Sequence, residues 1–78
     1  MTEGDVGDSD LLCSPMPGKV IKINAKNGEE IKKGTVILVI EAMKMENNLV
    51  AHKDAKIEKI SVSLGEMVEA GVPLVYFE

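Results

Sequence analysis

The chain has 78 residues and a formal net charge of −4, with one cysteine, one histidine and no arginine. This length allows one small domain, which buries only about 60% of the surface that its unfolded chain exposes and leaves little room for an enclosed active site. The single cysteine excludes an internal disulfide. The lack of a basic patch and the scarcity of aromatic residues for base stacking argue against nucleic-acid binding.

No apolar run in the sequence approaches the roughly 20 residues that are needed to cross a membrane. No secretory signal is recognisable either, and a single cysteine fits a reducing compartment. We therefore expect a cytoplasmic protein, or one of the mitochondrial matrix if its parent enzyme is eukaryotic, with no direct insertion into a membrane.

The net negative charge of the chain comes from its amino terminus. Acidic residues at positions 3, 5, 8 and 10 precede Leu11 without an offsetting lysine, whereas the remaining residues carry nine acidic groups and nine lysines. A short acidic and glycine-rich segment cannot bury enough apolar surface to become ordered. We predict a disordered acidic tail over residues 1–10 and one folded domain over residues 11–78.

In chain order, short segments rich in valine and isoleucine alternate with Gly, Pro and Asn, and no helical period of apolar residues is present. The expected strands are Leu11–Cys13, Lys19–Ile23, Glu30–Ile31, Val36–Glu41, Asn47–Val50, Lys56–Ile60, Met67–Val68 and Leu74–Phe77. The continuous apolar runs within Val36–Ile40 and Leu74–Phe77 predict the most buried strands. The pattern predicts an all-β domain, a flattened eight-stranded antiparallel barrel or sandwich.

An internal repeat relates the two halves of the chain without a gap. At an offset of 37 positions, Gly28 lies over Gly65, Gly34 over Gly71, and Glu41 over Glu78. Two copies of one supersecondary unit predict two halves related by an approximate two-fold axis. The same offset carries Lys44 onto Gly7 or just past Glu78, so we predict that Lys44 and the chain ends lie at opposite poles.

Lys44 lies between two strand-like segments, where a tight turn is required. Tight hairpin turns favour Asn-Gly, Asp-Gly or Gly pairs because these residues tolerate positive φ. Here the turn reads Met43-Lys44-Met45 instead. An exposed lysine at a rigid tip is well placed for acylation by another protein, although an ordinary lysine is protonated at neutral pH and does not activate itself.

The run Ala42-Met43-Lys44-Met45 resembles the attachment site of biotin carboxyl carrier domains, whose motif is Ala-Met-Lys-Met. The resemblance covers roughly residues 11–78 and includes the turn from Ser14 to Gly18, which is similar to the family's Ala-Pro-Met-Pro-Gly. Two positions depart from it, because His52 stands where many members have proline and Ala55 where many have glycine. Both lie away from Lys44 and concern local turn geometry.

The resemblance implies that a biotin protein ligase attaches biotin to Lys44. It also implies that the biotinyl domain then carries a carboxyl group between the biotin carboxylase and carboxyltransferase sites of a biotin-dependent carboxylase, or serves a decarboxylase. Glu41, Ala42, Met43, Met45 and Glu46 are the expected residues for recognition by the ligase and partners. On this interpretation the domain is a carrier and not an enzyme, and it supplies no catalytic residue.

Three other functions compete with this interpretation. A lipoyl domain of an oxo-acid dehydrogenase uses the same barrel and hairpin lysine, but its site usually has Asp before the lysine and Ala after it. An unmodified structural or adaptor barrel would have no reason to keep so awkward a turn. A self-sufficient enzyme lacks both a pocket and catalytic residues.

Other residues have simpler interpretations. A soft-metal site made by Met43, Met45, Cys13 and His52 is conceivable, but the register places Cys13 and His52 on a different turn, so no metal site is expected. Cys13 is expected to be a small buried hydrophobe, and His52 a loop residue.

Overall fold

The computed structural model describes residues 11–78, so the prediction of a disordered tail over residues 1–10 lies outside the described part. Its elements are β1 (Leu11–Cys13), β2 (Gly18–Ile23), β3 (Glu30–Ile31), β4 (Val36–Ala42), β5 (Met45–Val50), β6 (Ala55–Ile60), β7 (Met67–Val68) and β8 (Pro73–Phe77). All eight expected strands are present, and no helix occurs among residues 11–78. The predicted all-β fold is confirmed.

The strands form two four-stranded antiparallel sheets, with the orders β1-β8-β6-β3 and β5-β4-β2-β7. The 37-residue offset carries each strand of the second sheet onto the equivalent strand of the first, in the same order. The turns repeat as well: the Gly28 amide donates to Ile57 O at 2.7 Å, and the Gly65 amide donates to Val20 O at 2.7 Å. The molecule therefore has the two quasi-equivalent halves that the sequence repeat predicted.

Even the irregularities of the sheets are repeated. The β2–β4 register skips Ile21 and the β6–β8 register skips Glu58, which are equivalent positions. Likewise, the β4–β5 register skips Ile37 and the β1–β8 register skips Leu74. Because a bulge bends a strand and increases its twist, these paired bulges curve each sheet around the common core.

The core lies between the two sheets and is formed by aliphatic side chains from both halves. Its fully buried large members are Ile37, Leu38, Ile40, Ile57, Leu74, Val20 and Val75. The run Ile37–Ile40 in β4 is continuously buried, as expected. In β8 the expectation holds only for Leu74 and Val75, because Tyr76, the equivalent of buried Val39, lies on the outer side with its large amphipathic ring 36% exposed.

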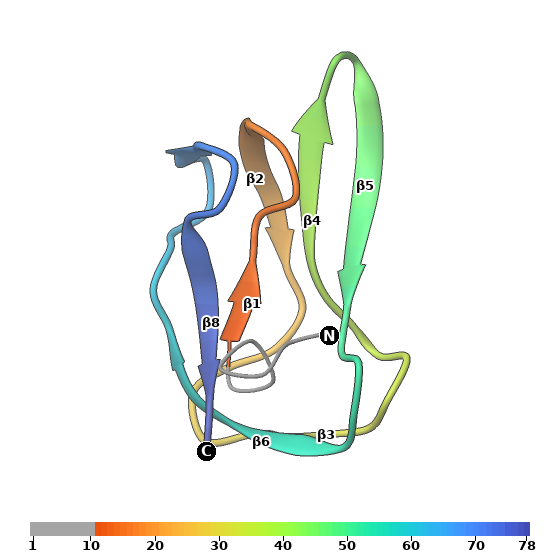
Figure 1. The fold of residues 1–78 in the computed structure, drawn as a ribbon, viewed down its shortest axis with the longest axis vertical. Helices are drawn as coiled ribbons and strands as arrows, with labels where there is room; N and C mark the ends of the chain where they lie inside the picture. Colours follow the sequence, from red (N-terminus) through yellow and green to blue (C-terminus); the bar gives the residue numbers. More distant parts are fainter. Residues whose placement is uncertain (1–10) are drawn as a thin grey trace.

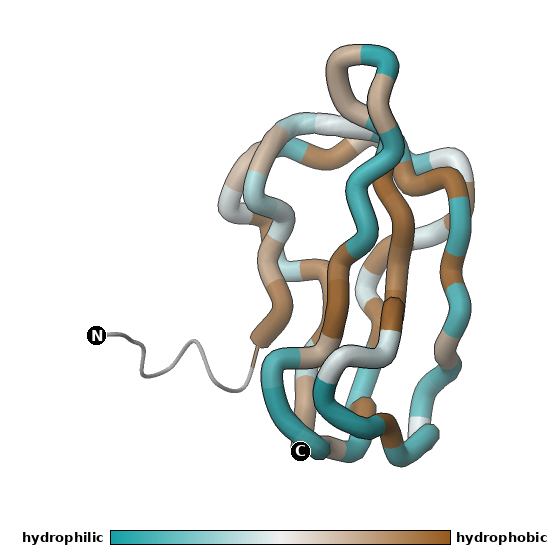
Figure 2. The backbone as a smooth tube through the Cα atoms, turned by 90° about the vertical axis from the view of Figure 1, so that its right-hand side faces the viewer, coloured by the Kyte–Doolittle hydropathy of each residue, from teal (hydrophilic) through white to brown (hydrophobic). Residues whose placement is uncertain are grey.

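The β4–β5 hairpin projects beyond the body of the barrel, and the carboxyl terminus lies at the other end of the long axis (Figure 1). Figure 2 shows the same projection in a perpendicular view, with mostly hydrophilic turns at the end opposite the hairpin. The repeat predicted that the Lys44 hairpin and the chain ends lie at opposite ends of the barrel, and the carboxyl terminus agrees with this prediction.

Candidate functional site

The candidate site is the tip of the β4–β5 hairpin. Ala42 of β4 pairs with Met45 of β5, so Met43 and Lys44 are the two residues of the turn. Both have positive φ, 54° for Met43 and 67° for Lys44. Positive φ at both central residues is the signature of a type I′ turn, whose twist matches that of the flanking strands.

The turn is held in an unfavourable conformation by the hairpin below it. A non-glycine residue in the left-handed region costs roughly 1–2 kcal/mol. The β4–β5 register continues from Val36↔Val50 up to Ala42↔Met45, and the ladder restrains the strand ends on both sides of the turn. The Asn47 side-chain amide also donates to Met45 O at 3.2 Å. These restraints hold the tip in one conformation, which keeps Lys44 at a fixed place.

Small residues under the tip allow β2 to approach the hairpin closely. A Cβ added to Gly18 would lie 2.8 Å from Glu41 O and 3.4 Å from the Ala42 Cβ. Ala42 is only 6% exposed. A docking protein therefore cannot reach the Ala42 methyl group directly, and any influence of Ala42 on recognition passes through the shape of the hairpin.

The remaining side chains of the tip face solvent. Met43 is 92% exposed and Met45 is 67% exposed, while Lys44 is also exposed. Within residues 11–78, the Lys44 ammonium has no hydrogen-bond or ion-pair partner. A primary amine at the end of a long side chain, free of local partners and raised above the body, fits the covalent attachment of a carboxylic acid cofactor.

Glu41 and Glu46 lie directly opposite each other below the tip, and both are exposed. Like charges at directly opposite positions of an antiparallel pair are destabilising. On its other side Glu41 faces Lys19 of β2, which is also exposed. The two carboxylates thus give the hairpin an acidic outer face that its folding does not require.

The structure does not assemble the alternative metal site. Among residues 11–78, no group of three or more His, Cys, Asp or Glu side chains could hold a metal ion. His52 follows the end of β5 that is distant from the tip. Cys13 was expected to be a small buried hydrophobe and is only half-buried, because it ends the short strand β1 at a register shift in the pairing with β8.

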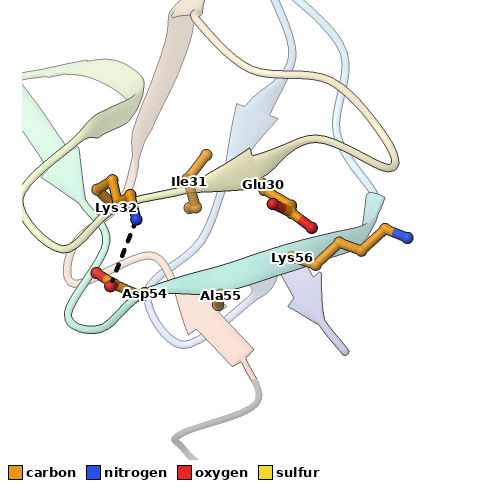
Figure 3. Close-up of a pocket in the computed structure, with 6 residues that line it drawn as sticks. All are labelled: Glu30, Ile31, Lys32, Asp54, Ala55 and Lys56. Atoms are coloured by element: carbon orange, nitrogen blue, oxygen red, sulfur yellow. Dashed lines mark ion pairs between the residues drawn. The ribbon is translucent and has the colours of Figure 1, made fainter.

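A hollow of about 370 Å³ lies beside β3 and the start of β6, and it is lined by Glu30, Ile31, Lys32, Asp54, Ala55 and Lys56 (Figure 3). The Lys33 amide donates to Asp54 Oδ1 at 2.8 Å, and Lys32 Nζ lies 4.0 Å from Asp54 Oδ2. These contacts explain the shape of the turn. The lining has no nucleophile paired with a base, and the hollow belongs to the end of the barrel opposite Lys44, so it contributes nothing to the candidate site.

No helix within residues 11–78 is long and apolar enough to span a bilayer.

A family model described as "Biotin-requiring enzyme" matches residues 10–77. The chain belongs to this family. The resemblance read from the hairpin is therefore confirmed, and the chain is a biotinyl-type domain.

Similar proteins include chains of carboxylases. The mitochondrial propionyl-CoA carboxylase alpha chain of Mus musculus is 43% identical over 70 residues, which are 90% of this chain and 10% of that one. The biotin-dependent acyl-coenzyme A carboxylase alpha3 subunit of Mycobacterium leprae is 37% identical over 71 residues, 91% of this chain and 12% of that one. The chain thus spans about a tenth of the length of these relatives.

Solved structures share the fold. A single-chain, multi-domain long-chain acyl-CoA carboxylase superposes with a TM-score of 0.83 at 29% identity, over 96% of this chain and 8% of that one. The urea carboxylase of Kluyveromyces lactis superposes with a TM-score of 0.83 at 35% identity, over 100% of this chain and 7% of that one. In each case the biotinyl-type domain corresponds to a small part of a much longer chain.

Two residues of the site were not anticipated from the sequence. Gly18 supports the hairpin through its missing Cβ, and Asn47 does so through its hydrogen bond to Met45 O. The sequence held a signal for Gly18, since a glycine at the start of a strand often marks a close approach of another backbone. It held none for Asn47, whose contact depends on the turn conformation of residues 43–44.

Proposed function

We propose that Lys44 is the biotin attachment site, and that the domain carries a carboxyl group between the biotin carboxylase and carboxyltransferase sites of a biotin-dependent carboxylase. The observation that supports this most is the Ala-Met-Lys-Met motif on a two-residue left-handed turn, with Lys44 exposed at the tip. A biotin protein ligase is the expected modifying enzyme. The working compartment would be the cytoplasm or the mitochondrial matrix.

Attachment joins Lys44 Nζ to the carboxyl carbon of biotin. The ammonium must release one proton to become a nucleophile and a second as the amide forms, while the leaving group of the activated donor departs. Glu41 and Glu46 are directed outwards and make no contact with Lys44 that would take these protons, so the ligase must remove them. The product amide is neutral, so the net charge of the hairpin end becomes more negative by one.

Bound biotin supplies a ring nitrogen that can accept a carboxyl group and give it up again. The contribution of the domain is to position the attached biotin. The stiff hairpin holds Lys44 away from the body, and tethering of the domain to its parent enzyme gives effective concentrations on the order of mM for short flexible links. None of the described residues is needed as an acid, base or nucleophile in the transfer, because the loading and unloading sites belong to the partner domains.

The test is the intact mass of the chain after expression with a biotin protein ligase and free biotin, beside Lys44→Arg. The proposal predicts a biotin-sized increment on the wild-type chain and none on Lys44→Arg. A parallel expression with a lipoate ligase tests the related carrier function. A lipoyl-sized increment there, with no biotin increment in the first experiment, would assign the domain to acyl transfer instead.

A further inference from the structure

None of the methionine side chains within residues 11–78 is fully buried. Met16 is half-buried against the core, whereas Met43, Met45 and Met67 are 92%, 67% and 69% exposed. The largest fully buried side chains of this part of the chain are all isoleucine, leucine or valine. Peroxides in solution can reach an exposed thioether and convert it to the polar sulfoxide. Three methionines are therefore open to oxidation.

Two of these methionines bracket the proposed attachment lysine. Met43 precedes Lys44 in the two-residue turn, and Met45 begins β5 immediately after it. Consecutive Cα atoms are about 3.8 Å apart, so both side chains start at the same projecting tip as the lysine (Figure 1). An enzyme that takes the Lys44 amine into its catalytic centre must therefore cover at least part of both thioethers.

The position of the tip does not depend on the two sulfur atoms. Ala42 and Met45 pair through their backbones at the base of the turn. The Asn47 side-chain amide donates to the backbone oxygen of Met45 at 3.2 Å. Because Met43 and Met45 are mostly in solvent, a more polar group at sulfur would remove little buried apolar surface. A chemical change at sulfur thus alters the surface of the tip and leaves the barrel and the turn in place.

Met67 provides an internal comparison. It is as exposed as Met45 but belongs to β7, at the opposite edge of the sheet. Three strand spacings separate β7 from β5, or roughly 14 Å. Met67 lies opposite the exposed Lys19, whereas Met45 lies opposite Ala42, whose side chain is buried. Oxidation of Met67 would therefore make the same chemical change at a place remote from the tip.

We propose that Met43 and Met45 form a reversible oxidation site, and that their conversion to sulfoxides by peroxides impedes the acylation of Lys44. This rests on the function proposed above. It adds to that function a dependence on oxidants, because the reduced tip is the form that accepts biotin. The chain would then remain folded under oxidative conditions while its supply of newly biotinylated carrier falls.

The oxidation transfers one oxygen atom to sulfur. A lone pair of the methionine sulfur attacks one oxygen of hydrogen peroxide, and the O–O bond breaks as the S–O bond forms. The other oxygen leaves as hydroxide and takes up the proton of the transferred oxygen, which gives water. The thioether loses two electrons and the peroxide gains them. Methionine sulfoxide reductases reverse the change with a dithiol as reductant, one enzyme for each sulfoxide epimer.

The sulfoxide changes what an acylating enzyme must bury. A thioether is apolar and flexible, and it adapts to irregular apolar surfaces. A sulfoxide oxygen accepts hydrogen bonds, and its burial without a donor is unfavourable. Since Met43 and Met45 lie on both sides of Lys44, the enzyme cannot enclose the amine and leave both sulfoxides fully hydrated. The expected consequence is slower biotinylation of an otherwise intact domain.

The test uses the chain before biotinylation, because biotin has a thioether of its own. The chain is treated with hydrogen peroxide, catalase removes the excess, and peptide mapping counts the oxygen atoms added to each methionine and to Cys13. A ligase that labels the untreated chain is then added, and biotinylation is followed by intact mass. We expect Met43 and Met45 to be oxidised before Met16. We expect kcat/KM to fall about tenfold, which is the order expected for burial of one unpaired polar group.

Two variants separate the tip from the rest of the chain. The double variant Met43→Leu, Met45→Leu keeps apolar side chains but has no oxidisable sulfur at the tip, so peroxide should leave its own initial rate unchanged. Met67→Leu keeps both tip methionines and should lose as much activity on oxidation as the wild-type chain. Methionine sulfoxide reductases with a dithiol should restore labelling of the oxidised wild-type chain. Urea unfolding of each sample verifies that the barrel remains folded.

Labelling of the oxidised wild-type chain at its untreated rate would overturn the proposal. An equal loss of rate in the double leucine variant would also overturn it, because the damage would then lie outside the tip. A marked loss of stability on oxidation of the wild-type chain would show that peroxide acts through the fold instead. Failure of the untreated wild-type chain to be labelled would contradict the proposed function itself.

Discussion

The two ends of the barrel are built by equivalent segments of the repeat, and they differ more in side chains than in backbone. The far end carries Lys26, Lys32, Lys33 and Lys53, whereas the equivalent positions at the hairpin end are Ser63, Glu69, Ala70 and Met16. The backbone hydrogen bonds of the turns are nevertheless the same at both ends. One backbone thus serves two surfaces, one rich in lysine and one poorer in lysine that carries Lys44 at its tip.

The residues with positive φ also differ between the connecting turns and the hairpin tip. Four of those within residues 11–78 are glycines in two equivalent pairs, Gly28 with Gly65 and Gly34 with Gly71. The other two are Met43 and Lys44, at the tip of the hairpin. The chain uses relaxed turn chemistry wherever a turn only connects strands, and departs from it at the residue proposed to carry biotin. Local strain of this kind concentrates at functional sites.

The largest expected loss of stability comes from truncation of equivalent core residues, which tests whether the two halves share the core equally. Ile37 and Leu74 occupy equivalent bulges and are both fully buried. Truncation of either to alanine should cost about 2–5 kcal/mol, because it removes transfer free energy and leaves a cavity. Urea unfolding of Ile37→Ala and Leu74→Ala should give similar losses. A difference of several kcal/mol between them would show that the two halves do not share the core equally.

Gly18→Ala should break the equivalence at the hairpin end. Its Cβ would meet the Glu41 carbonyl oxygen at 2.8 Å, so β2 or the hairpin must move. We expect a loss of about 1–3 kcal/mol, as for other overpacked sites, and slower biotinylation. At the equivalent position of the far end the chain has Ala55, so the control is the reverse substitution, Ala55→Gly. It should cost only about 0.5–1 kcal/mol of stability through chain entropy and leave labelling unchanged. Equal labelling rates in both variants would contradict the role of Gly18.

Met43→Asn should separate stability from recognition at the tip. Asparagine tolerates the left-handed region that Met43 occupies with φ of 54°. The free energy of unfolding should therefore rise by about 0.5 kcal/mol, since part of the roughly 1–2 kcal/mol cost is removed. Biotinylation should slow, because a 92% exposed contact side chain is lost. A variant that is less stable than the wild-type chain would mean that Met43 contributes to packing.

The smallest effect is expected at the far end. The ion pair between Lys32 and Asp54 is exposed, and exposed pairs contribute about 0–1 kcal/mol. Lys32→Ala should therefore change stability by only a few tenths of a kcal/mol, on the order of other surface pairs. Asp54→Ala should cost about 1 kcal/mol, because the Lys33 amide also loses its acceptor. Thermal unfolding of both variants separates the ion pair from the hydrogen bond.

Much of the fold followed from the sequence because two patterns are strong. The valine- and isoleucine-rich segments located the eight strands, and the 37-residue repeat predicted the two quasi-equivalent halves. The strand ends at the hairpin were less accurate. We expected β4 to end at Glu41 and β5 to begin at Asn47, but the ladder continues to Ala42 and Met45. Methionine and lysine carry no turn signal, so the sequence could not reveal a two-residue turn.

The candidate site was predictable in its lysine and less so in its surroundings. Lys44, Met43 and Met45 are exposed at a tip, as expected from the hairpin position. Ala42 was grouped with the recognition residues, yet its side chain is buried against the backbone near Gly18. The supporting contacts of Gly18 and Asn47 depend on strand pairing between distant segments, which local patterns do not encode.

The most direct test of the account is residue-level mapping of the attached group after labelling by a biotin protein ligase. The chain has nine lysines, several of them exposed at the far end, so chemical accessibility alone would distribute the label. Peptide mapping by tandem mass spectrometry should find biotin on Lys44 only, and Lys44→Arg should abolish the label without moving it. Stoichiometric label on any other lysine, in a folded chain, would contradict the claim that the strained hairpin tip defines the site.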